Sequence, residues 1–274
     1  MGDDVECAGT FVAPGAAPPP AVAIRGLVKR FDGKTAVAGI DLDVPAGSFF
    51  GLVGRNGAGK STTIKMATGL LRPDAGQAWI AGIPVWPNAS AAKALIGVLP
   101  EDPTSFDRLS TIELLEYHGL LRGLSASEVG QRAAELLHVL DLSSATGVAA
   151  LDLSTGMRKK LGLACALIHA PRVLFLDEPF ESVDPVSART IQDVLTRVTA
   201  TGGTVVFSSH VMDTVERLCD RVAIVHEGKI CAVGSIDEAT AGRTKRLEDV
   251  FLALVGGTAA GSDGSLGWLA SSSV

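Results

Sequence analysis

Residues 54–62 read Gly-Arg-Asn-Gly-Ala-Gly-Lys-Ser-Thr, and this stretch decides the fold. It fits the pattern G-x-x-x-x-G-K-[ST] of a phosphate-binding loop. The apolar run 49–53 before it predicts a strand, and a helical pattern begins at about Thr63. Glycines let successive N–H groups turn inward around phosphate oxygens, and the helix N-terminus adds a favourable dipole. With a strand before it and a helix after it, the loop is predicted to bind a nucleotide rather than to be an idle glycine-rich turn.

Two residues of this loop have specific expected tasks. Lys60 is expected to reach the β- and γ-phosphates as a point charge, and the Ser61 hydroxyl to ligate Mg2+. The full set expected to contact the nucleotide is Gly54, Arg55, Asn56, Gly57, Ala58, Gly59, Lys60, Ser61 and Thr62.

The second motif is a pair of acidic residues. Asp177 and Glu178 come directly after the apolar run Val-Leu-Phe-Leu at residues 173–176. Ligands of α/β proteins sit at the carboxyl ends of such strands. We expect Asp177 to hold Mg2+ through water and Glu178 to orient and deprotonate a water that attacks the γ-phosphate. Acidic residues at strand ends are also common turn formers, but the phosphate loop favours the catalytic interpretation.

His210 ends the next apolar strand, residues 205–210. A single histidine after a strand is more often structural than catalytic. Because the neighbouring strand ends in Asp177 and Glu178, the His210 side chain can share their cleft and hydrogen-bond the γ-phosphate.

The wider pattern predicts an α/β fold with antiparallel strands early and a helical insert in the middle. Residues 40–44 alternate strictly, and residues 76–82 form a short run bounded by glycines, so both are predicted strands. Residues 111–140 carry leucines at helical spacing. Later come apolar strands at 173–176 and 204–207 with a helix over about 186–198 between them, which is typical of a buried parallel sheet.

Composition excludes several classes of protein. The 274 residues carry 24 Lys and Arg against 30 Asp and Glu, a net charge of -6, so no basic stripe for nucleic acid is expected. Apolar runs stay shorter than the roughly 18 residues that cross a bilayer, so membrane contact is expected only through a partner. Four cysteines without a CxxC pair predict buried or idle thiols: Cys7, Cys165, Cys219 and Cys231.

Both ends of the chain are predicted to lie outside the folded domain. Residues 13–21 are rich in Pro and Ala, so residues 1–21 are expected to be a disordered tail. Residues 256–274, rich in Gly, Ser and Ala, are expected to be a second flexible tail.

Together these motifs resemble an ATP-binding-cassette (ABC) ATPase, the nucleotide-binding subunit of an ABC transporter. The family signature Leu-Ser-Gly-Gly-Gln appears as Leu-Ser-Thr-Gly-Met at residues 153–157, and residues 182–185 look like the family's D-loop. His210 looks like the switch histidine. Phe31 resembles the aromatic residue that stacks on adenine, with a buried core phenylalanine as the competing interpretation.

The resemblance covers about residues 22–255 and implies a P-loop NTPase cassette. Such a cassette has a RecA-like, mostly parallel sheet, an antiparallel β subdomain and a helical subdomain, here at about residues 101–165. It implies ATP and Mg2+ as cofactors and a head-to-tail dimer, with itself or a related ATPase subunit. By the same resemblance, Ser154 and Gly156 are expected to contact the other subunit's γ-phosphate in that dimer; the competing interpretation of Ser154 is a plain helix N-cap.

The resemblance also implies a separate transmembrane permease, which would hold the chain peripherally at the cytoplasmic face of the cell membrane. Residues 247–252 look like the branch that pairs with export permeases for drugs, lipids or polysaccharides. The alternative is a non-transport ABC ATPase of translation or DNA repair, which is disfavoured by the single cassette and the absence of sustained heptads between residues 60 and 153. A kinase or GTPase would leave the signature and His210 unexplained.

Two departures from the family pattern affect the site. Glu101, within residues 99–103, replaces the usual glutamine, and Thr155 and Met157 replace a glycine and a glutamine of the signature. Glu101 can still approach Mg2+ or the attacking water, but it brings a charge and loses a donor. The competing interpretation is a solvated loop acid beside two prolines.

Overall fold

The computed structural model describes residues 19–87, 89–103 and 108–255. The predicted features of Cys7, of most of the N-terminal tail and of residues 256–274 lie outside these ranges. Ala21, which the composition assigned to the tail, is buried, and its N–H donates to the carbonyl of Val44.

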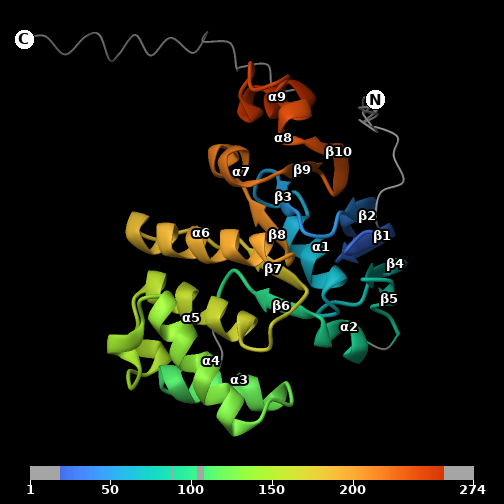
Figure 1. Cartoon of the computed structure of the whole chain (residues 1–274). Coiled ribbons are helices and arrows are strands. Elements are labelled where there is room, and N and C mark those ends of the chain that lie inside the picture. Colours follow the sequence, from blue (N-terminus) through green and yellow to red (C-terminus); the bar gives the residue numbers. More distant parts are fainter. Residues whose placement is uncertain (1–18, 88, 104–107, 256–274) are drawn as a thin grey trace, which may run out of the picture.

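A six-stranded sheet forms the centre of the protein, with the strand order β10-β9-β3-β8-β7-β6 (Figure 1). Neighbouring strands from β9 to β6 are parallel, and β10 is antiparallel to β9. The strands are β3 (Phe49–Val53), β6 (Ile96–Leu99), β7 (Val173–Asp177), β8 (Thr204–Ser209), β9 (Arg221–His226) and β10 (Lys229–Ser235). This sheet confirms the predicted α/β class and the RecA-like, mostly parallel arrangement.

The register of this sheet brings the predicted site residues to one edge. Val53 lies opposite Ser209 in the β3–β8 pair, and Asp177 lies opposite Ser208 in the β7–β8 pair. Every residue of β3, β7 and β8 is buried, as their continuous apolar sequences predict. The phosphate loop, the two acids and His210 therefore leave the sheet side by side.

A second, four-stranded antiparallel sheet lies beside the first and contains the early strands that the alternating pattern predicts (Figure 1). Its order is β2-β1-β4-β5, with β1 (Val22–Phe31), β2 (Lys34–Val44), β4 (Ala75–Ile80) and β5 (Ile83–Pro84). Apolar residues of this sheet share one core with Phe50, Phe175 and the inner face of α1 (Lys60–Ala67).

Helices of the middle third gather at one end of the molecule, away from the small sheet (Figure 1). The predicted leucine-rich segment forms α3 (Thr111–Leu121) and α4 (Ala126–Val139), each opened by a serine capping box. The segment from 109 to 150 is closed at its base: Thr111 N–H donates to the Val148 carbonyl at 2.9 Å, and Ala150 N–H to the Leu109 carbonyl at 2.9 Å.

The remaining helices pack on the central sheet or, at the C-terminal end, on one another. They are α2 (Ser90–Ala94), α5 (Thr155–Leu167), α6 (Pro185–Ala200), α7 (Met212–Leu218), α8 (Ile236–Ala239) and α9 (Leu247–Leu254). α5 begins at the signature segment and packs against α3, α6 and β6, so it links the helical subdomain to the sheet.

Close packing of α5 on β6 depends on Gly97. A Cβ at this position would lie 2.1 Å from the Ala166 carbonyl oxygen and 2.9 Å from Leu174 Cδ1. Gly97→Ala is therefore expected to lower the free energy of unfolding by about 1–3 kcal/mol, the usual result of overpacking. Urea unfolding of the variant and the unmodified chain measures this loss.

Gly130→Ala is the matched control, because a Cβ at this position in α4 meets no described atom within 4 Å. Alanine is the better helix former, so this variant should be unchanged or more stable by up to about 1 kcal/mol. Equal midpoints for the two variants would contradict the packing argument.

Three of the four cysteines lie in the core. Cys165, Cys219 and Cys231 are buried, and burial raises the pKa of the Cys165 thiol to about 12. These positions agree with the expectation of buried thiols.

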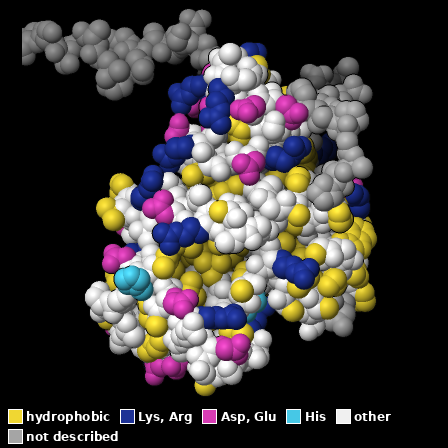
Figure 2. Space-filling model, in the orientation of Figure 1, with side chains coloured by type: hydrophobic (Ala, Val, Ile, Leu, Met, Phe, Trp, Pro, Cys, Tyr) yellow, Lys and Arg dark blue, Asp and Glu magenta, His cyan; other side chains and the backbone are white. Residues whose placement is uncertain are grey.

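On the face seen in Figure 2, acidic and basic side chains are interspersed, and hydrophobic side chains gather near the middle. Among the described residues, helices that are both long and apolar enough to span a membrane are absent.

Candidate functional site

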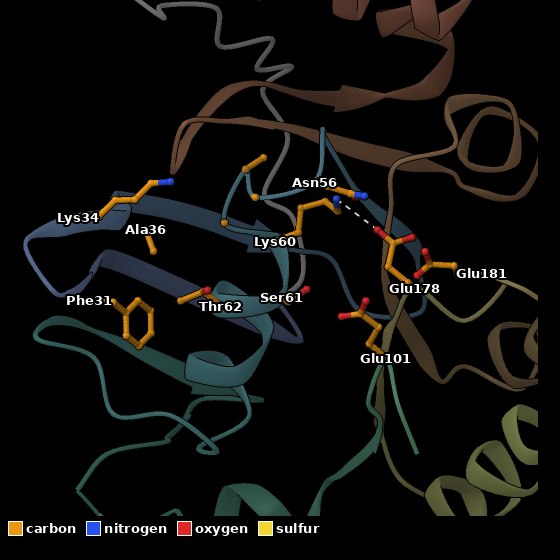
Figure 3. Close-up of a pocket in the computed structure, with 13 residues that line it drawn as sticks. Phe31, Lys34, Ala36, Asn56, Lys60, Ser61, Thr62, Glu101, Glu178 and Glu181 are labelled. Carbon is orange, nitrogen blue, oxygen red and sulfur yellow. Dashed lines mark ion pairs between the residues drawn. The ribbon is translucent and has the colours of Figure 1, made fainter. Parts of the chain in front are cut away.

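A cavity of about 430 Å³ opens at the carboxyl edge of the central sheet, beside the phosphate loop (Figure 3). The small sheet forms one wall, and the segment after β7 with Glu101 forms the other. Its lining residues are Phe31, Lys34, Ala36, Asn56, Gly57, Ala58, Gly59, Lys60, Ser61, Thr62, Glu101, Glu178 and Glu181. Residues that the sequence separates by more than a hundred positions thus share one site.

Glycine is required at two turns of the phosphate loop. Gly59 has φ +105°, and a Cβ there would lie 2.5 Å from the Ala36 carbonyl oxygen. A Cβ on Gly54 would lie 2.3 Å from the Val225 carbonyl oxygen. Gly59 is also the N-cap of α1, so no side chain from that position caps the first N–H groups of the helix. These donors form a cradle for an anion at the helix N-terminus.

Lys60 is held inside this loop and is only 5 % exposed. Its Nζ donates to the carbonyl oxygens of Gly54 at 2.8 Å and Arg55 at 3.3 Å. It also forms an ion pair with Glu178 Oε1 at 3.2 Å, drawn as the dashed line in Figure 3. The loop therefore fixes the Lys60 ammonium group at the position where the phosphates are predicted to bind.

Asp177 is buried and joins the loop to the sheet edge. Its Oδ1 accepts hydrogen bonds from Ser61 Oγ at 2.8 Å and from Ser208 Oγ at 2.6 Å. Ser208 Oγ in turn accepts from the Glu178 N–H at 3.0 Å. This network sets the position of the Glu178 backbone as well as that of Asp177.

Glu178 and His210 contact each other. His210 Nδ1 lies 3.1 Å from Glu178 Oε2, while the other carboxylate oxygen of Glu178 faces Lys60. His210 therefore lies beside the acid that follows β7, as the sequence predicts. The carboxylate is thus held between Lys60 at the start of α1 and His210 directly after β8.

Phe31 and Glu101 lie on opposite sides of the cavity (Figure 3). Phe31 is 46 % exposed, which contradicts the core interpretation and leaves its ring available to a planar ligand. Glu101 is exposed as a loop acid, yet it lines the cavity together with Glu178.

Sequence analysis missed Lys34, Ala36 and Glu181, which also line the cavity. Glu181 had a signal, since it is the third acidic residue within five positions after the strand. Lys34 and Ala36 follow a β1–β2 turn, and only the tertiary structure brings that turn to the loop.

Four predicted nucleotide contacts do not line this cavity: Gly54 and Arg55 at the start of the phosphate loop, and Ser154 and Gly156 of the signature. Ser154 is the N-cap of α5 and accepts from the Met157 N–H at 3.3 Å, as the capping interpretation predicts. Gly156 packs on the start of α6, where a Cβ would lie 2.8 Å from Asp184 Oδ2. The exposed Ser154 therefore stands apart from this chain's own phosphate loop.

The oxygen groups beside the loop fit a magnesium ion that is completed by ligand phosphates. The Ser61 hydroxyl and the Asp177 carboxylate meet at 2.8 Å. The described residues contain no group of three or more His, Cys, Asp and Glu side chains that could hold a metal by themselves. Mg2+ is characteristically bound by one or two protein oxygens together with phosphates and water.

Comparison with known proteins gives a consistent picture. Residues 37–181 match the family described as ABC transporter. The chain is 37 % identical over 211 residues to the linearmycin resistance ATP-binding protein LnrL of Bacillus subtilis, covering 77 % of this chain and 68 % of that protein. It is 37 % identical over 221 residues to the daunorubicin/doxorubicin resistance ATP-binding protein DrrA of Streptomyces peucetius, covering 81 % and 67 %.

Solved structures include a close match in fold. A structure of the ATP-binding subunit of an ABC transporter superposes with a TM-score of 0.80 at 28 % identity, covering 86 % of this chain and 99 % of that one.

Proposed function

This chain belongs to the ABC transporter family as an ATP-binding subunit that hydrolyses ATP to power a membrane transporter, and from this premise we propose that the transporter is an exporter of drugs or related amphiphiles. The names of LnrL and DrrA, both resistance proteins, support this cargo class. Neither of these relatives is named for translation or DNA repair, so the non-transport alternative gains no support.

The observation that carries the chemistry is the pairing of Glu178 with Lys60 and His210 at the mouth of the phosphate loop. In the proposed reaction Lys60 turns to the β- and γ-phosphates, which frees the Glu178 carboxylate to accept a proton from water. The water oxygen bonds to the γ-phosphorus as the bond to the ADP oxygen breaks. His210 donates a hydrogen bond to the γ-phosphate and holds Glu178 in place.

Nucleotide binding in this proposal uses the rest of the cavity. The adenine stacks on Phe31, and the phosphates lie in the cradle of residues 54–62. Ser61 directly and Asp177 through water would hold Mg2+, and Glu101, which lines the same cavity, would be available to the ion. When bound, the ion neutralises charge on the phosphate oxygens.

The position of the signature supports a head-to-tail dimer. Ser154 and Gly156 lie outside the chain's own cavity. A second ATPase subunit, identical or related, then supplies the signature to each phosphate loop.

A separate permease is the proposed transmembrane partner, and it would hold this subunit at the cytoplasmic face of the membrane. To test this function, the chain is co-expressed with a candidate permease encoded beside it. Inside-out vesicles should accumulate a fluorescent amphiphilic drug with MgATP and not with a non-hydrolysable analogue. ATP hydrolysis without drug accumulation would remove the exporter proposal and leave the ATPase.

Glu101 gives a prediction about magnesium. If its carboxylate joins Asp177 and Glu178 around one cleft, their mutual repulsion is relieved by the ion. Glu101→Gln should therefore make hydrolysis less dependent on Mg2+ concentration while ATP binding is largely kept. The test is to measure the hydrolysis rate as a function of Mg2+ concentration for the unmodified chain and for Glu101→Gln. Superimposable curves would place Glu101 outside the reach of the ion.

A further inference from the structure

Lys159 is a buried ammonium group that none of the proposed steps uses. It lies in the second turn of α5, beyond the signature segment, and is 4 % exposed. Its Nζ donates to two backbone carbonyl oxygens, those of Glu101 and of Glu178, the latter at 3.1 Å. One side chain of the signature helix thus bonds to both acidic segments of the cavity wall.

Burial disfavours the charged form of Lys159, and the nearby carboxylates favour it. Burial lowers the pKa of Lys159, against the opposing effect of Glu181, Glu101, Asp177 and Glu178. Within the described residues Lys159 has no ion pair with a carboxylate. The ammonium group therefore bonds to the main-chain carbonyl oxygens of Glu101 and Glu178 and not to their carboxylates.

The Glu178 main chain needs such support. Its φ is +46°, a left-handed conformation that is strained for a residue with a side chain. The N–H is held by Ser208 Oγ, while the carbonyl accepts from Lys159 and from the Glu181 N–H at 3.3 Å. Bonds on both sides of the Cα thus fix the direction in which the carboxylate leaves the chain.

We propose that Lys159 is a positioning residue for ATP hydrolysis, which ties the signature helix α5 to the main chain of Glu178 and of Glu101. The proposal rests on the proposed role of Glu178 as the base. A displacement of α5 moves this ammonium group and with it the carbonyl of the base. Engagement of the signature by a second subunit is then transmitted to the place where water is activated.

Lys160 provides a matched control. It is the next residue of α5, is 5 % exposed, and donates to the carbonyl oxygen of Asp141 at 3.4 Å. Asp141 also has a positive φ, +54°, but it follows the C-cap of α4 and does not line the cavity. Both lysines thus donate to main-chain carbonyl oxygens, one at the site and one away from it, and Lys160 Nζ in addition lies 4.0 Å from Asp141 Oδ2.

The experiment compares Lys159→Met with Lys160→Met. Lys159→Met is expected to lower kcat about 10- to 100-fold, the usual cost of a misplaced catalytic group, with KM for ATP changed less than about 3-fold. Lys160→Met should leave kcat per folded molecule unchanged even if its melting temperature falls. Lys159→Arg, which keeps a charged donor, should recover part of the lost kcat.

Amide hydrogen exchange supplies a readout independent of turnover. Lys159→Met should speed exchange at residues 178–181, and Lys160→Met should not. If Lys159→Met does not fold, Lys159→Gln takes its place in both assays. Equal kcat and equal exchange in the two methionine variants would overturn the proposal. If the unmodified chain showed no ATPase activity, but residues 178–181 still exchanged faster in Lys159→Met than in Lys160→Met, only the proposed role of Glu178 as the base would be overturned.

Discussion

Glu178→Gln is expected to reduce ATP hydrolysis about 100- to 10,000-fold while ATP is still bound. The amide keeps the shape of the side chain beside Lys60 and His210, but it cannot take the proton of the attacking water. In the proposed head-to-tail dimer ATP lies between the two subunits, and we expect the subunits to separate only after hydrolysis, so the ATP-bound dimer should accumulate. Gel filtration with MgATP measures this, together with phosphate release.

Glu248→Gln is a suitable control, since it removes the same charge from an exposed position in the first turn of α9. Its turnover and elution should match the unmodified chain. A Glu178→Gln chain that remains monomeric in MgATP and hydrolyses at the normal rate would contradict both the base and the dimer.

Lys60→Ala is expected to weaken ATP binding about 100-fold or more, and hydrolysis with it. Truncating one member of a buried, hydrogen-bonded charge pair commonly costs about 2–5 kcal/mol. Here the loss is compounded, because Glu178 then faces the incoming phosphates without its partner at 3.2 Å. Titration with labelled ATP measures the affinity.

Two further variants separate the causes of that loss. Lys65→Ala removes an exposed lysine from the last turn of the same helix and should bind ATP normally. Lys60→Ala combined with Glu178→Gln should bind ATP more tightly than Lys60→Ala alone, because the repelling carboxylate is gone. Unchanged affinity in Lys60→Ala would remove the phosphate-loop assignment.

Local sequence predicted the parts of the fold that have a strong short-range signal. Strands β3, β7 and β8 are continuous apolar runs, so they were identifiable without tertiary information. The short β6, four residues with Gly97 among them, carries too little pattern to be distinguished from a loop. Strands β9 and β10 were not predicted either, although β9 completes the site edge by pairing with β3.

Prediction of the site had the same limit. Residues within one motif were found, because spacing alone identifies a phosphate loop. Lys159 was not, since two adjacent lysines in a helix usually mark a solvated face. Its burial depends on carbonyl oxygens at positions 101 and 178, and only the packing of α5 against the sheet brings these oxygens to its Nζ.

The closed base of the segment from 109 to 150 has a consequence for how such a protein changes over time. Since Leu109 and Ala150 are joined by a hydrogen bond, and Thr111 and Val148 by another, the entry and exit of α3 and α4 are fixed at one point. An insertion at the exposed residues 122–123, between α3 and α4, leaves this closure in place, whereas Leu115 and Leu137 must keep their positions in the main core. The outer surface of the helical hairpin is therefore the part of the molecule that can diverge to suit a new partner while the hydrolytic machinery is inherited intact.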